Sequence, residues 1–227
     1  MVIAEAFSEF VSRGRGGGWL RSRYVADYSS GMSIPVLEKQ ADVATSDWSS
    51  LGQEEKRMRL LLAAGEVFAR DGLDAPMPAV AAAAGAGVGS VYRQFPSKRD
   101  LLAALVVERL QESERGAEAA LASGEDRWSA LTGLLWTLAE RQAGDDVLGE
   151  AMATVSEHPA VVEALAATLY SLERLLDAAR AEGKLRADAT ALDLRLLFAA
   201  TRAASLLEAG AWQRMLELGI DALRVPV

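Results

Sequence analysis

The stretch that decides the fold is residues 85–98, which read Gly85-Ala86-Gly87-Val88-Gly89-Ser90-Val91-Tyr92-Arg93-Gln94-Phe95-Pro96-Ser97-Lys98. The glycines predict a tight turn, and the residues that follow form a short helix that the proline ends. Small residues at the front of this helix permit a close approach to another molecule. The tyrosine, arginine, glutamine and lysine behind them carry hydrogen-bond donors of the kind that bind phosphate oxygens. A short exposed helix behind a tight turn has the geometry of a DNA recognition helix.

The composition favours a helical protein without metal or disulfide chemistry. The 227 residues are 51% hydrophobic and include no cysteine and a single histidine, which leaves little for a zinc site or a serine–histidine relay. We therefore expect no cofactor, no metal ion and no enzymatic activity. No apolar run approaches the roughly 20 residues that span a bilayer, and the N-terminus lacks an export pattern, so we expect a cytoplasmic protein with no membrane partner.

The net charge of -8 argues against a nucleic-acid partner until its distribution is considered. Residues 54–115 hold nine Lys or Arg and nine Asp or Glu, whereas residues 118–227 hold ten against seventeen. The acidic excess therefore lies mainly in the second half, away from the short helix. We expect the DNA affinity to be modest and sensitive to salt.

Residues 1–52 differ from the rest because glycine and serine interrupt any periodic pattern. We interpret them as a disordered extension or as a reading frame begun too far upstream, with Met32 as a plausible start and residues 1–31 absent from the native protein. The alternative is a basic arm that reaches into a DNA groove. Its basic residues would be Arg13, Arg15, Arg21 and Arg23. The interspersed acidic residues favour the first interpretation.

From Glu54 onward, apolar residues recur at three- and four-residue spacing, and no segment alternates as a strand would. The sequence therefore predicts an all-α protein. Gly72 is expected to end the first helix, and Ser97 and Asp100 are expected to form a capping box. The helices are expected at residues 54–71, 79–84, 88–95, 97–122, 127–143, 147–156, 160–182, 189–209 and 211–224.

The stretch from Arg57 to Leu102 resembles the DNA-binding domain of the TetR (tetracycline-repressor-like) family of bacterial transcription regulators. The resemblance is cumulative, because each segment is weak alone and the order and spacing are specific. The matching segments read LLAA (61–64), FARDGLDA (68–75), VAAAAG (80–85) and GSVYRQFPSKRDLL (89–102). The resemblance implies a helix-turn-helix DNA-binding domain at 53–100 and a helical ligand-binding and dimerisation domain at 101–227.

The resemblance also implies a function and a set of DNA contacts. Family members are homodimers that bind a palindromic double-stranded operator, and a small molecule bound in the second domain releases them. By position, base edges and the adjacent backbone would meet Val88, Gly89, Ser90 and Arg93. Phosphates would be bound by Tyr92, Gln94 and Lys98. The alternative for Tyr92, and for the neighbouring Phe95, is a place in the core. Pro76 and Gly87 depart from the family, since many relatives have a hydroxyl side chain at each position.

The second domain offers candidate residues with less specific patterns. An unidentified apolar effector would contact Trp128, Leu135, Trp136, Met152, His158 and Tyr170, although such residues more often form core and His158 fits a helix end. The last two helices of the family pair across the dimer. The residues assigned to that interface are Leu192, Leu196, Ala199, Ala203, Leu206, Trp212, Met215, Leu216, Ile220 and Leu223. We expect a ligand-responsive repressor; the alternative is a helical ligand-binding or protein-interaction module that has lost specific DNA binding.

Overall fold

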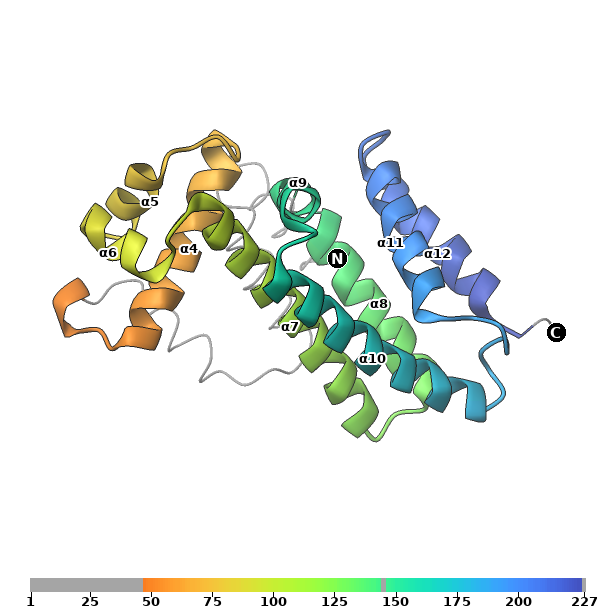
Figure 1. The fold of residues 1–227 in the computed structure, drawn as a ribbon. Helices are drawn as coiled ribbons and strands as arrows, with labels where there is room; N and C mark the ends of the chain where they lie inside the picture. The colour runs from red at the N-terminus through yellow and green to blue at the C-terminus, as the bar shows by residue number, and fades with distance from the viewer. Residues whose placement is uncertain (1–46, 144–145, 226–227) are drawn as a thin grey trace, which may run out of the picture. The chain divides into compact units, whose positions relative to one another are not determined.

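The computed structural model describes residues 47–143 and 146–225, and the regular elements of these residues are helices (Figure 1). The only β feature in this part of the chain is an isolated antiparallel bridge between Leu185 and Arg224. The prediction of an all-α fold is confirmed. The elements are η1 (Trp48–Ser50), α4 (Gln53–Asp71), α5 (Met77–Ala83), α6 (Val88–Gln94), α7 (Lys98–Ala122), α8 (Arg127–Ala143), α9 (Asp146–Val155), α10 (Pro159–Ala181), α11 (Ala191–Ser205) and α12 (Ala211–Leu223).

The chain divides into two compact units between Leu101 and Leu102. Unit 1 contains α4, α5 and α6, and unit 2 contains α8 to α12 together with most of α7. The expectations for the N-terminal extension, including the arm with Arg13 and Arg15, lie almost wholly outside the described residues. No helix among the described residues is long and apolar enough to cross a membrane.

The core of unit 1 forms because each helix buries one apolar stripe. α5 packs against both α4 and α6, and the largest fully buried side chains are Phe68 and Phe95. Gly72 ends α4 with φ 79°, a left-handed value that favours glycine, and its N–H donates to the Phe68 carbonyl at 2.9 Å. The predicted end of the first helix is confirmed.

The start of α7 is fixed by the capping box that the sequence predicts. The Ser97 backbone N–H donates to Oδ2 of Asp100 at 2.9 Å, and the Asp100 N–H donates to Oγ of Ser97 at 3.2 Å. These two bonds satisfy backbone donors that would otherwise lack partners at a helix N-terminus, which stabilises the helix by ~1 kcal/mol. Lys98 is therefore held in the first turn of α7.

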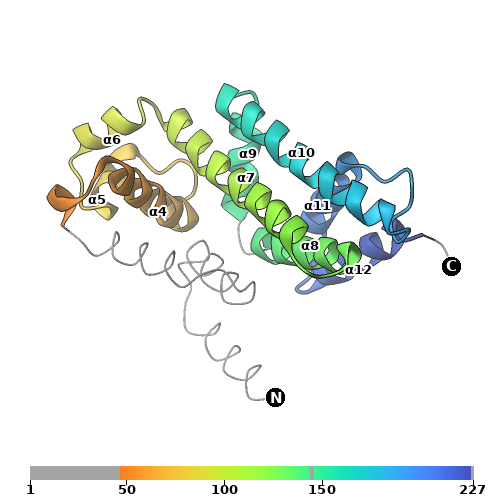
Figure 2. The same ribbon diagram turned by 90° about the horizontal axis from the view of Figure 1, so that it is seen from below.

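Unit 2 is built around α8, which contacts α9, α10, α11 and α12. α11 and α12 lie side by side as a pair (Figures 1 and 2). Their backbones approach closely because Gly219 has no side chain; a Cβ there would lie 2.1 Å from Cδ1 of Leu197. The unit thus has a large apolar core that holds Leu131, Leu135, Leu175 and Leu194.

Candidate nucleic-acid interface and cavity

The short helix α6 is amphipathic. Val91 and, just after the helix, Phe95 are fully buried, whereas Val88 and Tyr92 are 39% and 47% exposed. Arg93 is also exposed. Because these positions are three or four residues apart, one face of α6 packs into unit 1 and the other presents polar side chains to solvent. Of the two aromatic residues for which a place in the core was the alternative, Phe95 is therefore a core residue and Tyr92 is not.

The turn before α6 depends on a glycine. Gly85 has φ 65°, and the N–H of Ala86 donates to the Ala81 carbonyl at 2.9 Å, which closes the end of α5. A Cβ on Gly85 would also lie 3.2 Å from Nη2 of Arg59. The turn then delivers Gly87 as the N-cap of α6 in an extended conformation, φ -71° and ψ 142°.

Two of the expected base-contacting residues are joined to each other. Nη2 of Arg93 donates to Oγ of Ser90 at 2.8 Å, one turn earlier on the exposed side of α6. The bond holds the guanidinium along the helix instead of leaving the long side chain to sample many rotamers. Ser90 and Arg93 therefore act as a pair.

Two cations of unit 1 lie over the buried rings of phenylalanines. Nζ of Lys98 is 5.7 Å from the centre of the Phe68 ring, and Cζ of Arg57 is 4.8 Å from the centre of the Phe95 ring. Such contacts orient a cation without neutralising it, at ~0.5–1 kcal/mol each where the site is exposed. The motif predicted that Lys98 lies at the start of its helix. Arg57 was missed, because nothing in the sequence links it to a ring 38 positions later.

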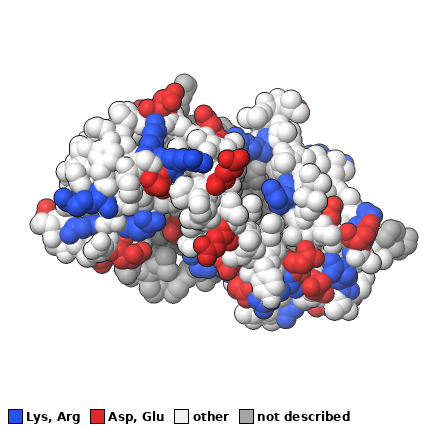
Figure 3. All heavy atoms as spheres, in the orientation of Figure 1, with Lys and Arg blue, Asp and Glu red and all other residues white. Residues whose placement is uncertain are grey.

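Basic groups are therefore present on unit 1 although the chain as a whole is acidic. Residues 53–101 carry seven Lys or Arg and six Asp or Glu. Figure 3 shows several of the basic groups on the face of the molecule that it presents, over the part of the chain that includes α4 to α6. Two acidic groups are already engaged within the unit, since Asp71 pairs with Arg70 and Asp100 caps α7.

The two departures from the family pattern have structural counterparts. Pro76 and Gly87 are the N-cap residues of α5 and α6, and neither makes a side-chain cap bond. A serine or threonine at an N-cap would accept from the backbone and leave its hydroxyl proton available to a phosphate. Each site therefore has one polar group fewer than a hydroxyl side chain would supply.

A cavity of about 350 Å³ lies within unit 2, at the lower end of the ~300–1,000 Å³ range for small-molecule pockets. Helices α7 to α11 all contribute to its walls. The lining residues are Arg109, Leu110, Ser113, Leu138, Gln142, Leu148, Gly149, Met152, Leu165, Thr168, Leu169, Leu172, Arg195, Phe198 and Arg202. No group of three or more His, Cys, Asp or Glu suited to a metal ion occurs among the described residues.

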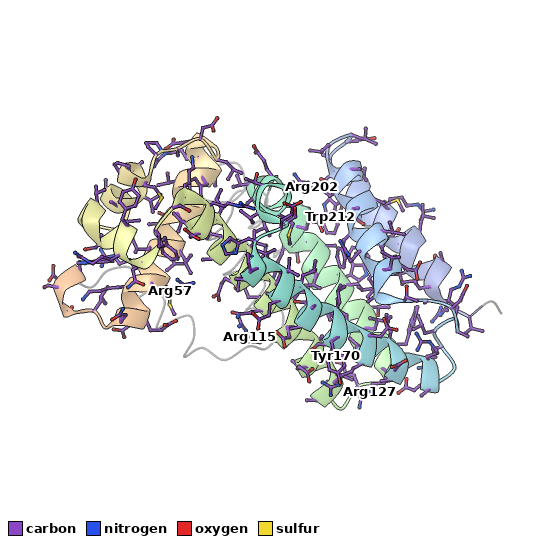
Figure 4. The ribbon with its side chains drawn as sticks, in the orientation of Figure 1. Arg57, Arg115, Arg127, Tyr170, Arg202 and Trp212 are labelled. Atoms are coloured by element: carbon purple, nitrogen blue, oxygen red, sulfur yellow. The ribbon has the colours of Figure 1, made fainter. Side chains whose placement is uncertain are left out.

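The six expected effector contacts are not gathered at this cavity. Met152 lines it, while Trp128 and Leu135 are buried in the core and Trp136 packs against that core. Tyr170 is 69% exposed on α10 (Figure 4) and is not among the residues that line the cavity. His158 is the N-cap residue of α10, which agrees with its interpretation as a helix end.

The expected dimer residues fall into two groups. Eight are exposed or partly exposed, and Leu192, Leu196 and Leu206 are among the most exposed large apolar residues of the described chain. Leu216 and Leu223 differ from the expectation, because both are buried in the unit's own core. The reason is that this face of α12 packs on α8 and α11.

Polar groups near the cavity are held by bonds that the sequence did not indicate. Glu112 lies between two arginines: Oε2 is 3.2 Å from Nη1 of Arg109 and 3.8 Å from Nη1 of Arg141. The buried Thr168 hydroxyl lies 3.0 Å from the Leu110 carbonyl of α7. These contacts tie α7 to α8 and α10 at one side of the cavity.

Comparison with known proteins agrees with this geometry. The family model for bacterial regulatory proteins of the TetR family matches residues 60–105, from the middle of α4 into α7. The repressor KstR of Mycobacterium tuberculosis is 30% identical over 118 residues, which are 52% of this chain and 54% of the relative. The chain thus spans about half the length of the curated relatives it matches.

Solved structures extend the likeness to both units. A TetR transcription regulatory protein from Mycobacterium vanbaalenii is 31% identical, with a TM-score of 0.57 over 75% of this chain and 95% of that chain. A TetR transcriptional regulator from Streptomyces coelicolor is 25% identical, with a TM-score of 0.57 over 75% and 99% of the two chains. The match at α4 to α7, together with a relative whose chain is covered almost entirely, establishes that this protein belongs to the TetR family of bacterial regulatory proteins.

Proposed function

We propose that this protein is a transcriptional repressor that binds a palindromic DNA operator as a homodimer and is released by a small molecule. The observation that carries the proposal is α6, which buries Val91 and exposes Tyr92 and the Ser90–Arg93 pair. An exposed helix of this kind enters the major groove in helix-turn-helix proteins, and its polar side chains meet base edges and phosphates. The protein would then act in the cytoplasm, where its DNA is, and not as an enzyme.

In this proposal, some residues of α6 contact bases and others, with Lys98, contact phosphates. Val88, Gly89, Ser90 and Arg93 meet base edges and the adjacent backbone. Phosphates are bound by Tyr92, Gln94 and Lys98, and the lysine stands in the first turn of α7, where a helix N-terminus also attracts anions. The cation–π contact to Phe68 keeps the ammonium of Lys98 near one position before DNA arrives.

The dimer would form through the exposed apolar side chains of α11 and α12. Leu192, Leu196 and Leu206 are more than half exposed, which is unusual for three leucines on one helix and its end. A second copy that covers them would give an isologous interface. Leu196→Asp should therefore yield a monomer in light scattering, whereas Val162→Asp, on the exposed side of α10, should leave the dimer intact.

The direct test of DNA binding is a titration of the full chain with the DNA that flanks its own gene. Binding to one fragment at low salt, competed poorly by unrelated DNA, supports the proposal. Footprinting should then show a protected site with two-fold symmetry. The absence of any preferred fragment would favour a ligand-binding or protein-interaction module, for which Pro76 and Gly87 are the structural arguments.

A further inference from the structure

The cavity of unit 2 has a charge opposite to that of the unit around it. Residues 102–227 contain twenty Asp or Glu against twelve Lys or Arg. The described residues that line the cavity include Arg109, Arg195 and Arg202, and none of them is Asp or Glu. A random selection from this unit would hold more carboxylates than arginines, so the lining favours negatively charged molecules.

The position of Arg202 depends on a glycine in the facing helix. A Cβ on Gly149 would lie 0.9 Å from Nη1 and 1.9 Å from Cζ of Arg202, so the guanidinium of α11 occupies the space that a side chain on α9 would fill. Figure 4 labels Arg202 beside α9. Glycine inside a helix costs about 1 kcal/mol relative to alanine. Here it makes room for an arginine at the wall of the cavity.

The other lining residues are mainly apolar. Phe198, Met152 and six leucines surround the space, and Ser113 adds a hydroxyl group. Two further polar side chains already make bonds within the fold: Nε2 of Gln142 donates to the Phe198 carbonyl at 2.9 Å, and the Thr168 hydroxyl lies 3.0 Å from the Leu110 carbonyl. The charged groups of the wall are its three arginines, next to a broad apolar surface, and Arg109 is already paired with Glu112 of α7.

We propose that the cavity binds an apolar molecule that carries one anionic group, a carboxylate or a phosphate. The planar guanidinium of Arg202 binds the anion, Arg195 adds positive charge, and the apolar side chains cover the body of the molecule. This inference deepens the proposed function and rests on it only in treating the cavity as the effector site. Binding itself is measured on the protein without DNA.

The experiment compares matched ten-carbon probes by calorimetry on the full-length protein. Decanoate and decyl phosphate carry the anion, decanol is neutral, and decyltrimethylammonium is a cation. Charge-assisted hydrogen bonds predict that at least one anionic probe binds about tenfold or more tightly than decanol, and that the cation binds least. The two anionic probes distinguish a carboxylate ligand from a phosphate ligand.

Two variants test whether Arg202 causes this preference. Arg202→Gln and Gly149→Ala should each bring anion affinity to within about threefold of decanol affinity while decanol binding persists. Persistent decanol binding also shows that the variant is folded. The matched control is Arg174→Gln, which removes an exposed arginine of α10 that pairs with Glu118 outside the cavity, and it should keep the full preference.

The outcomes separate this inference from the proposed function. Equal affinity for decanol and both anions, no binding of either anion, or an unchanged preference in Arg202→Gln would each overturn the inference and leave DNA binding untouched. Conversely, anion-selective binding by a protein that prefers no DNA fragment would support the inference and contradict the proposed function. Release of bound DNA by the preferred anion, but not by decanol at the same concentration, would support both.

Discussion

Nη2 of Arg93 lies 2.8 Å from Oγ of Ser90, so the exposed face of α6 presents an arginine whose direction is already set. Arginine donates two parallel hydrogen bonds to guanine, which lysine cannot reproduce. Arg93→Lys should therefore keep non-specific DNA affinity while relaxing discrimination at one base pair per half-site by about 1–3 kcal/mol. Competition with operators changed at single positions measures this effect.

Ser90→Ala provides the companion measurement for that arginine. It removes the acceptor but leaves the charge, so the preferred bases should change while the salt dependence stays the same. Identical base preferences in the wild type, Arg93→Lys and Ser90→Ala would show that α6 does not read sequence through this pair.

Lys98→Ala should weaken binding to every DNA sequence alike. One phosphate contact fewer lowers the slope of log K against log salt by about one unit per protomer. Anisotropy titrations at several salt concentrations give this slope. Arg174→Ala is the control, because it removes one positive charge from α10 in unit 2 and leaves α6 and Lys98 unchanged. A slope that does not change in Lys98→Ala would refute the phosphate contact.

Gly87→Ser should strengthen both α6 and DNA binding. Gly87 has the extended φ and ψ of an N-cap, and no atom lies within 4 Å of an added Cβ, so serine fits without strain. We expect the free energy of unfolding to increase by about a few tenths of a kcal/mol. The hydroxyl adds about two- to fivefold in operator affinity, as one neutral hydrogen bond of ~0.5–1 kcal/mol would. Gly87→Ala should show neither gain; equal gains in both variants would exclude the cap.

Acid should destabilise unit 2 through Asp126. The carboxylate accepts from Nζ of Lys184 at 2.8 Å and from the hydroxyl and N–H of Ser129, and these bonds hold the pKa of Asp126 far below its ordinary value. A carboxyl group with a lowered pKa stabilises the fold above about pH 4, and that contribution is lost as the pH falls further. Urea unfolding from pH 7 to pH 3 should show a shallower decline for Asp126→Asn than for the wild type. Parallel curves would contradict this role.

The sequence predicted the helices well because local signals mark their ends. Gly72 and the Ser97–Asp100 box stand at helix ends in the structure, and the largest boundary difference is at α11, which ends at Ser205 instead of residue 209. The position after Ser205 carries no glycine or proline until Gly210, so periodicity alone extended the helix. Apolar periodicity without an end signal does not show where a helix ends.

The cavity was less predictable because its chemistry comes from residues far apart in the chain. Gly149 and Arg202 are 53 positions apart, and neither stands in a motif. Trp128 and Leu135 have the same helical spacing as pocket residues would, yet they lie in the core of unit 2. Whether an apolar helix face lines a cavity or packs into the core depends on how α7 to α11 pack together. The periodicity of the sequence does not determine that packing.

The central claim is that α6 reads DNA. The most direct measurement is footprinting of the wild-type protein and of Arg93→Ala on the DNA that flanks the gene, at low and moderate salt. The account predicts one protected site with two-fold symmetry for the wild type, lost in Arg93→Ala while Arg174→Ala retains it. Equal protection by Arg93→Ala, or no protected site for the wild type at low salt, would contradict it.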